Sequence, residues 1–379
     1  FAISSVPTGF KSLCTQNLPD PLIDKGASYF DAKLYEGNGG NQQITGLGFS
    51  PDLVWIKNRS TYTNQGHAIF DIQRGKQMLS SASAEDEANW HGSNGLPYRG
   101  YVDSFDTNGF SLVKNSASNL ADYVNYNNAT YVAWAWDAGS TTDTNNTAGS
   151  ITPTGVLANP SAGFSIVSYT GTGSNATVGH GLNAAPEMVF YKSRGDANDW
   201  MVYHVGMGAA KSMLLNDGGR DASRADTFNS TAPTSSVLHV GTSATTNNTN
   251  SAGMIAYCFA PVSGYSSFGT FVGNGSADGP FVYTGFRPRW IMVKGQDYAG
   301  NWNIFDATRP GYNETDGVLR ANLGNPEFDG SAQGTYALGV DLLSNGFKIR
   351  QQGVDANSST KTLIYAAFAE HPFKTARAA

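Results

Sequence analysis

The chain has few cysteines, few charged residues and no long apolar run. Its 2 cysteines, Cys14 and Cys258, lie in different parts of 379 residues. Because Cys258 belongs to an apolar stretch, we expect buried free thiols rather than a disulfide. No run approaches the roughly 18 apolar residues that cross a membrane, so the sequence predicts no membrane insertion.

Charged residues make up only 14 % of the chain, and the formal net charge is −6. Lysine and arginine form no cluster, whereas non-specific DNA binding needs a basic face. We therefore predict that nucleic acid is not a partner.

Metal-binding patterns are missing as well. Residues 195–199 place oxygen ligands at alternating positions, like part of a Ca²⁺ loop, but the terminal glutamate is absent and a surface turn is the better interpretation. The Gly-x-Gly segments precede strands rather than helices, so they are not nucleotide cradles. The histidines have no zinc-ligand spacing; they are His67, His91, His180, His204, His239 and His371. The sequence therefore predicts neither a metal nor a cofactor.

Glycine, with 44 residues, and aromatic residues, at 12 %, are abundant by contrast. Asparagine, serine and threonine are plentiful, and no long helical pattern occurs. This composition is typical of an all-β protein with many turns, a weakly charged polar surface and aromatic-rich cores.

One stretch occurs three times. In each copy a proline and one polar residue precede four large apolar residues and a lysine; the copies run from Pro51 to Lys57, from Pro186 to Lys192 and from Pro288 to Lys294. Four consecutive apolar residues predict a strand buried on both faces, and proline is tolerated at a strand start. We expect each lysine to end its strand with the ammonium group in solvent. The alternative is that the lysines form a ligand-binding set.

Two further markers accompany each copy in the same order. An aromatic-x-Gly-x-Gly segment lies upstream, starting at Tyr35, Tyr169 and Phe271. An apolar strand lies downstream, ending at the aromatic residues Trp136, Phe259 and Phe368. Three markers in one order, three times, predict internal repetition.

The repeats predict an all-β fold of three tandem small β-sandwich or jelly-roll-like modules, preceded by an extended N-terminal arm. The Asn-Gly pairs at 108–109 and 345–346 predict hairpins. The expected boundaries are an arm at 1–28, repeats at 29–139, 161–262 and 263–373, a polar linker at 140–160 and a C-terminal tail at 374–379.

No set of residues predicts catalysis. Asp71, His204 and Asp306 occupy matching positions in the three repeats, but two acids and a histidine are no recurring catalytic set. We therefore predict that the chain is not an enzyme. Loop aromatics and amides are better candidates, because rings stack on sugars and amides bind hydroxyl groups. The candidate glycan-binding residues are Trp90, His91, Asn94, Tyr123 and Tyr126; alternatively, these rings pack within their own module or against a neighbouring subunit.

Several longer phrases carry a resemblance. Gly-Phe-Ser-Pro-Asp-Leu-Val-Trp-Ile-Lys-Asn-Arg at 48–59, with residues 169–180, 274–288 and 364–373, resembles an uncharacterised repeat module in tail-fibre-like and other virion proteins of marine tailed bacteriophages. That module often follows a SPRY-like, concanavalin-type domain, and residues 7–19 are similar to the exit from one. Because no methionine stands at position 1, we expect Phe1 to begin a processed or partial chain.

The resemblance implies a structural protein of the virion, foremost a fibre or spike-type appendage that binds a host-surface glycan or receptor. The alternatives are a capsid-surface fibre or decoration protein and, from another class, a glycan-degrading tailspike. The expected partners are other virion proteins, host-surface polysaccharide and two further copies of the chain in a homotrimer. A monomer whose three modules cover one another is the competing expectation.

Overall fold

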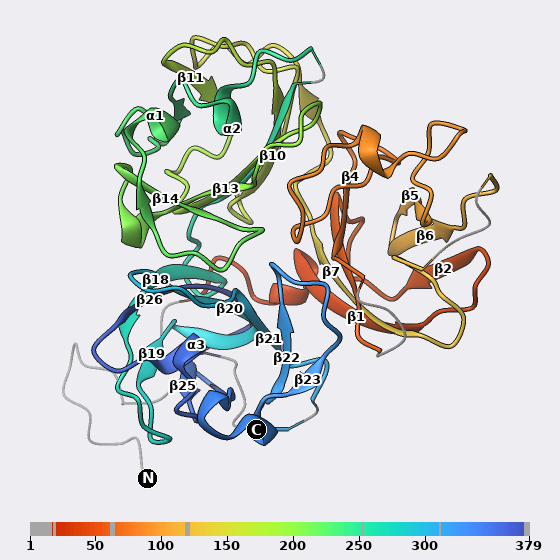
Figure 1. Cartoon of the computed structure of the whole chain (residues 1–379). Coiled ribbons are helices and arrows are strands. Elements are labelled where there is room, and N and C mark those ends of the chain that lie inside the picture. Colours follow the sequence, from red (N-terminus) through yellow and green to blue (C-terminus); the bar gives the residue numbers. More distant parts are fainter. Residues whose placement is uncertain are drawn as a thin grey trace.

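The computed structural model describes residues 17, 20–60, 65–117, 122–251, 253–310 and 312–374. Each predicted repeat forms a lobe, here called module 1, 2 or 3, and the lobes surround a common centre (Figure 1). Strands dominate, so the all-β prediction is confirmed. Helices in this part of the chain are short: η2 (Gly26–Ser28), η3 (Ala88–Trp90), η4 (Val205–Met207), η5 (Ser331–Tyr336), α1 (Ala225–Phe228), α2 (Ala244–Asn247) and α3 (Val354–Asn357).

The main antiparallel sheet of each module has the same strand order at its centre. Module 1 has β1 (Phe30–Glu36), β7 (Thr130–Trp136), β3 (Leu53–Asn58) and β4 (Ala68–Asp71). Module 2 has β10 (Phe164–Tyr169), β17 (Met254–Phe259), β12 (Met188–Ser193) and β13 (Met201–His204). Module 3 has β18 (Ser266–Val272), β26 (Thr362–Pro372), β20 (Phe286–Gly295) and β21 (Asn303–Asp306). The strand that carries the repeated apolar stretch therefore has matching neighbours in all three sheets.

Two of these sheets are extended at their edges. Beyond β13 and β21 lie β14 (Lys211–Leu214) with β15 (Ala222–Ser223), and β22 (Gly317–Arg320) with β23 (Phe328–Asp329). Beyond β10 lie β9 (Gly155–Asn159) and β8 (Thr142–Asp143). The expected polar linker at 140–160 is thus a strand-forming part of module 2. Val156 and Leu157 are buried there, which gives the segment an apolar reason to pair with β10.

A smaller sheet covers one face of each main sheet. These small sheets contain β2 (Gln42–Thr45), β6 (Gly109–Val113) and β5 (Tyr101–Asp106); β11 (Ala176–Gly179) and β16 (Val237–Val240); and β19 (Phe281–Tyr283), β25 (Gly346–Ile349) and β24 (Val340–Leu343). Both predicted Asn-Gly hairpins are confirmed, because Asp106 pairs with Gly109 and Leu343 with Gly346.

The repeated strand is buried on both faces, as its unbroken apolar run predicts. All six residues of β3 are buried. Val54 and Ile56 point into the core of module 1, whereas Leu53 and Trp55 belong to a core that all three modules share. The alternation of a strand therefore distributes the apolar side chains between two cores.

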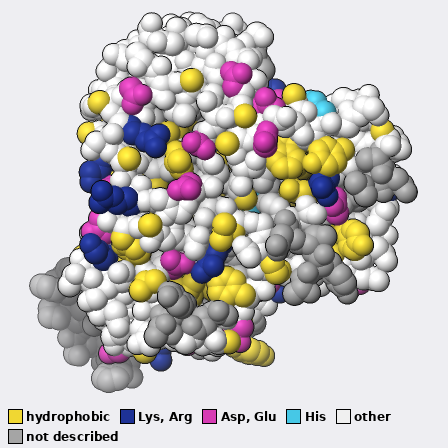
Figure 2. Space-filling view, in the orientation of Figure 1, with side chains coloured by type: hydrophobic (Ala, Val, Ile, Leu, Met, Phe, Trp, Pro, Cys, Tyr) yellow, Lys and Arg dark blue, Asp and Glu magenta, His cyan; other side chains and the backbone are white. Residues whose placement is uncertain are grey.

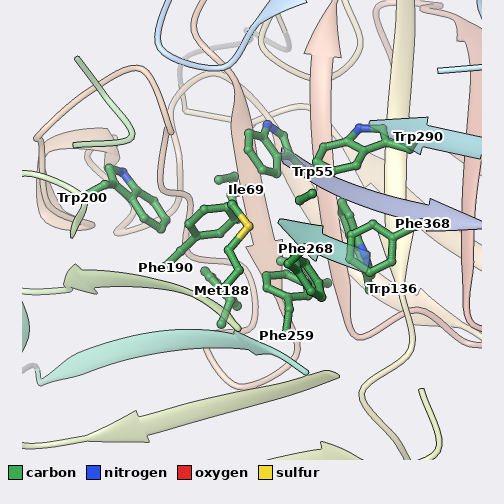
Figure 3. Close-up of a pocket in the computed structure, with 13 residues that line it drawn as sticks. Trp55, Ile69, Trp136, Met188, Phe190, Trp200, Phe259, Phe268, Trp290 and Phe368 are labelled. Carbon is green, nitrogen blue, oxygen red and sulfur yellow. The ribbon is translucent and has the colours of Figure 1, made fainter. Parts of the chain in front are cut away.

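The shared core is centred on the three closing aromatic residues of the repeats. Trp136 and Phe259 have ring centroids 6.2 Å apart, Phe259 and Phe368 5.7 Å, and Trp136 and Phe368 5.8 Å, all edge-to-face. Figure 3 shows them with the neighbouring rings around a cavity of about 10 Å³. The close packing of apolar rings from three modules makes the centre a core rather than a ligand site.

Some sequence-based expectations concern residues outside the described ranges. Most of the N-terminal arm, Cys14 and residues 375–379 of the tail lie there. Cys258 is a buried free thiol, as expected, and its burial raises the pKa of the thiol to about 12. No described helix has the length and hydropathy needed to cross a membrane.

Candidate functional site

Two of the five candidate glycan-binding residues, Trp90 and Tyr123, are packed inside module 1. Trp90 and Tyr123 are each only 8 % exposed, and their rings meet edge-to-face at 5.4 Å. Neither ring offers an open face to a sugar, so packing within the module is the interpretation that fits these two residues. Asn94 exchanges two 3.0 Å amide hydrogen bonds with Asn115.

The remaining two candidates differ in exposure. His91 is partly buried and hydrogen-bonds through Nε2 to the side-chain oxygen of Gln77. Tyr126 is 44 % exposed. The structure therefore does not combine the five candidates into one open site.

A buried asparagine next to Tyr126 in the chain holds the Gly-x-Gly turn of the module. The side-chain oxygen of Asn125 accepts a 2.9 Å hydrogen bond from the backbone N–H of Asn38. Asn247 and Asn357 form the same bond in modules 2 and 3, with Thr172 at 2.7 Å and Asn274 at 2.9 Å. The sequence interpretation did not recognise this shared structural role, although the asparagines precede the closing strand in every copy.

The close fit explains both glycines of each turn. A Cβ on the first glycine, Gly37, would lie 2.1 Å from the carbonyl oxygen of Tyr126. The second glycine has a φ of +68° at Gly39, +67° at Gly173 and +66° at Gly275, a conformation that favours glycine.

The three repeated lysines are buried, which corrects the expectation that their ammonium groups reach solvent. Lys57, Lys192 and Lys294 are all 0 % exposed. Lys57 Nζ donates to the carbonyl oxygens of Gln65 at 2.6 Å and of Gly324, in module 3, at 3.0 Å. A neighbouring module thus covers the strand end that one repeat alone would leave open.

The other two lysines use backbone acceptors in the same way. Lys294 Nζ donates to Gly218 at 3.1 Å and to Gly219 at 2.8 Å, both in module 2. Lys192 Nζ donates to Ser193 at 2.7 Å. Desolvation lowers the pKa of Lys57 to about 7 and the pKa values of Lys192 and Lys294 to about 8.

In each module, a ring N–H at one equivalent position donates a hydrogen bond to a neighbouring module. Each place where two modules meet in this way is here called a junction. The position lies directly before the strands β4, β13 and β21. The three bonds join His67 Nε2 to the carbonyl oxygen of Arg320 at 2.9 Å, Trp200 Nε1 to that of Ser80 at 2.8 Å, and Trp302 Nε1 to that of Leu214 at 2.8 Å. Module 1 therefore binds module 3, module 3 binds module 2, and module 2 binds module 1.

The tautomer of His67 follows from its two partners. Trp55 Nε1 donates a 2.7 Å hydrogen bond to His67 Nδ1. Nε2 must therefore carry the proton that it donates to Arg320. Burial lowers the pKa of His67 well below its ordinary value, so the imidazole is neutral and fulfils the role of an indole at this junction.

The matching residues Asp71, His204 and Asp306 lie on this ring of junctions. Asp71 accepts a 2.6 Å hydrogen bond from Tyr257 of module 2, and Asp306 accepts a 3.0 Å bond from the indole of Trp134 of module 1. His204 Nε2 contacts the carbonyl oxygen of Tyr365 of module 3 at 3.0 Å instead. All three residues are buried, and each reaches a different module.

A buried arginine completes two of these junctions. Arg74 Nε lies 2.5 Å from Asp71, and Arg309 Nε lies 2.7 Å from Asp306. Burying a charged pair is costly unless its geometry and its other hydrogen bonds are good. Arg74 meets this condition through further bonds to the carbonyl oxygen of Ile69 and to the hydroxyl of Tyr257.

A second contact occurs at the outer side of each junction. Arg59 pairs with Glu327, and Arg194 Nε lies 2.9 Å from Glu87. At the third junction the amide of Gln296 donates to Asp221 at 3.3 Å. In each case the backbone N–H of the acidic residue also donates to the carbonyl oxygen of its partner, at 3.0, 3.1 and 2.8 Å respectively. Glutamine in the third copy therefore preserves the contact.

One protein family is similar to the chain over all three modules. A family model described as "Domain of unknown function (DUF7483)" matches residues 25–372. The chain belongs to this family. No curated protein and no solved structure matches the chain. The DUF7483 match extends across all three modules, in agreement with their packing into one body.

The DUF7483 chain also contains a carboxyl pair in module 1, at a groove that module 2 helps to line. Asp52 and Asp137 hydrogen-bond to each other at a groove of about 580 Å³. Burial raises the pKa of Asp52 to about 7. Asp52 also accepts a 2.7 Å bond from the N–H of Ala138, so both acids fix the chain where it leaves module 1. Glycosidase acids stand about 5–9.5 Å apart, and two carboxyls in direct contact do not fit that chemistry.

Proposed function

We propose that the chain is a rigid structural part of a tailed-phage virion, in a fibre or spike-type appendage outside the particle. The phage assignment rests on the sequence resemblance. The observation that supports a structural role is the closed ring of equivalent, buried polar junctions. Opening any junction would leave carbonyl, carboxylate or ammonium groups without partners, and this is costly in a dry interface.

The surface is compatible with an extracellular structural part. On the face in Figure 2, acidic side chains are dispersed among neutral groups, and basic side chains lie mainly along the left edge with acidic groups nearby. Such a surface gives soluble display without a strongly charged field. The apolar side chains of the repeated strands β3 and β12 are directed instead into the module cores and the shared core.

The same packing supports a proposal for the assembly state. Fibre proteins gain buried area by winding three chains around an axis, whereas here three modules of one chain surround the axis. We therefore favour the monomer over the homotrimer within this proposal. Light scattering of the purified chain tests it: a mass near 40.2 kDa is expected, and a stable species of three times that mass would support the trimer.

The position on the particle is tested by antibody labelling. Gold-labelled antibody against the purified chain is applied to intact particles of the phage that encodes it and examined by electron microscopy. Label on tail fibres or spikes is expected, and antibody pre-absorbed with the chain is the control. Label spread over the shell would indicate a capsid decoration protein instead. Intact particles without label would contradict the proposal.

A further inference from the structure

A polar groove of about 560 Å³ lies where module 2 continues into module 3. It has the size of a small-molecule site. Its lining includes an acid, several hydroxyl groups and aromatic rings, which are Glu187, Ser263, Ser267, Thr284, Phe268 and Tyr283. Neither the sequence interpretation nor the ring of junctions assigns it a role.

Glu187 occupies a position that the other modules use for structure. It directly follows the repeated proline, as Asp52 and Arg289 do. Asp52 pairs with Asp137 and with the backbone of module 1. Arg289 lies 3.0 Å from Asp31 and thereby ties module 3 to module 1.

Glu187 lacks the two partners that its counterpart Asp52 has in module 1. Ala260 stands where module 1 has Asp137, directly after the closing aromatic residue, so the second carboxyl is absent. Pro261 stands where module 1 has Ala138, and proline has no N–H to donate. Within the described ranges the Glu187 carboxylate forms neither a hydrogen bond nor an ion pair. Partial desolvation raises its pKa.

An aromatic ring and free hydroxyl groups face the same groove. Tyr283 is 62 % exposed, although it belongs to a strand whose middle residue, Val282, is buried. Phe268, at 7 % exposure, forms an apolar part of the lining. Among the described residues the hydroxyls of Ser263 and Tyr283 have no hydrogen-bond partner.

We propose that this groove binds a neutral sugar residue of an oligosaccharide, with the ring of Tyr283 stacked on the apolar face of the sugar. The Glu187 carboxylate accepts hydrogen bonds from sugar hydroxyls, and charge-assisted bonds of this kind are strong. Ser263 supplies a further donor. An acidic sugar is disfavoured because its carboxylate would approach Glu187, while the ammonium of Lys374 is already paired with Asp20.

The experiment is saturation-transfer difference NMR with the whole chain and three probes at millimolar concentration: maltotriose, chitotriose and galactobiose. At least one probe is expected to show transfer. Tyr283→Ala and Glu187→Gln are each expected to weaken the affinity for that probe at least about tenfold, because each removes one main contact. Neither change affects the buried junctions, so circular dichroism is expected to show a folded chain.

Matched controls distinguish the groove from general surface binding. Tyr312→Ala removes another tyrosine of module 3, which is 88 % exposed and outside the groove. Glu85→Gln removes an exposed acid of module 1. Both variants are expected to bind as the parent does. Absence of transfer from all three probes, or transfer that survives Tyr283→Ala, would overturn the proposal. Either result would leave the location of the chain on the particle unaffected.

Discussion

The indole of Trp302 donates a 2.8 Å hydrogen bond to the carbonyl oxygen of Leu214, which belongs to the neighbouring module. Trp302 is 1 % exposed, and the acceptor is the last residue of its strand. Trp200 makes the equivalent bond to Ser80. One side-chain position thus connects modules that lie far apart in sequence.

We predict that Trp302→Phe lowers the free energy of unfolding by about 2 kcal/mol or more. Phenylalanine keeps most of the apolar contact but removes the donor and part of the buried volume, which leaves the carbonyl of Leu214 unpaired. Urea unfolding followed by circular dichroism measures the change.

Trp90→Phe is the matched control for this substitution. Trp90 is also buried, but among the described residues its Nε1 has no hydrogen-bond partner. Removing the indole nitrogen there costs only packing, so a smaller loss is expected. Equal losses in the two variants would show that the bond to Leu214 contributes nothing.

The buried asparagines lead to a second prediction. Asn357→Ala removes the acceptor for the N–H of Asn274 and the donor to the carbonyl oxygens of Ser276 and Gln351. Because these groups are partly buried, we expect a loss of about 2–3 kcal/mol in urea unfolding. Asn175→Ala, at an exposed position, is the control. A loss no larger than that of the control would mean that the clamp is dispensable.

The repeated strands were predictable because their signal is local. Four apolar residues between Pro51 and Lys57 suffice to predict a strand buried on both faces. The environment of Lys57 was not predictable, because its acceptor Gly324 belongs to another repeat. A single repeat, considered alone, places that lysine at an open strand end.

Contacts between modules in the candidate site were likewise not predictable from a single repeat. Gln296 stands where the other repeats have Arg59 and Arg194, yet its partner Asp221 preserves the contact. Only the placement of module 2 beside module 3 reveals this. A usable signal existed at His67, Trp200 and Trp302, which all directly precede equivalent strands. Trp90 and Tyr123 were predicted as loop residues, and sequence alone could not show that their rings pack on each other.

The raised pKa of Asp52 leads us to predict that stability depends on pH. Its pKa is raised from 3.8 to about 7 in the folded chain, so the folded state binds the proton more tightly than the unfolded state. Its stabilising contribution is complete below the unfolded pKa and is lost as pH rises through about 7. The difference in stability between Asp52→Asn and the parent is therefore expected to shift in favour of the variant by about 1–3 kcal/mol as the pH rises from 4.5 to 8.

Urea unfolding of both proteins at several pH values measures this difference. Asp226→Asn, a change in the first turn of α1 away from the groove, is the control for losing one carboxylate. A difference between Asp52→Asn and the parent that stays constant with pH would contradict a shared proton between Asp52 and Asp137.

The lowered pKa of Lys57 leads us to predict a pH dependence of stability with the opposite sign. Its pKa falls from 10.5 to about 7 on folding, so between these values the unfolded state binds more protons and stability rises with pH. Lys57→Met removes this rise. We compare the stability of Lys57→Met with that of the parent at each pH. This difference is expected to favour the variant by about 2 kcal/mol more at pH 6 than at pH 10, because only the ammonium form carries the burial cost. Urea unfolding at both pH values measures it, with exposed Lys25→Met as the control. Should the advantage of Lys57→Met be equal at both pH values, the ammonium of Lys57 must be fully compensated by its two carbonyl acceptors.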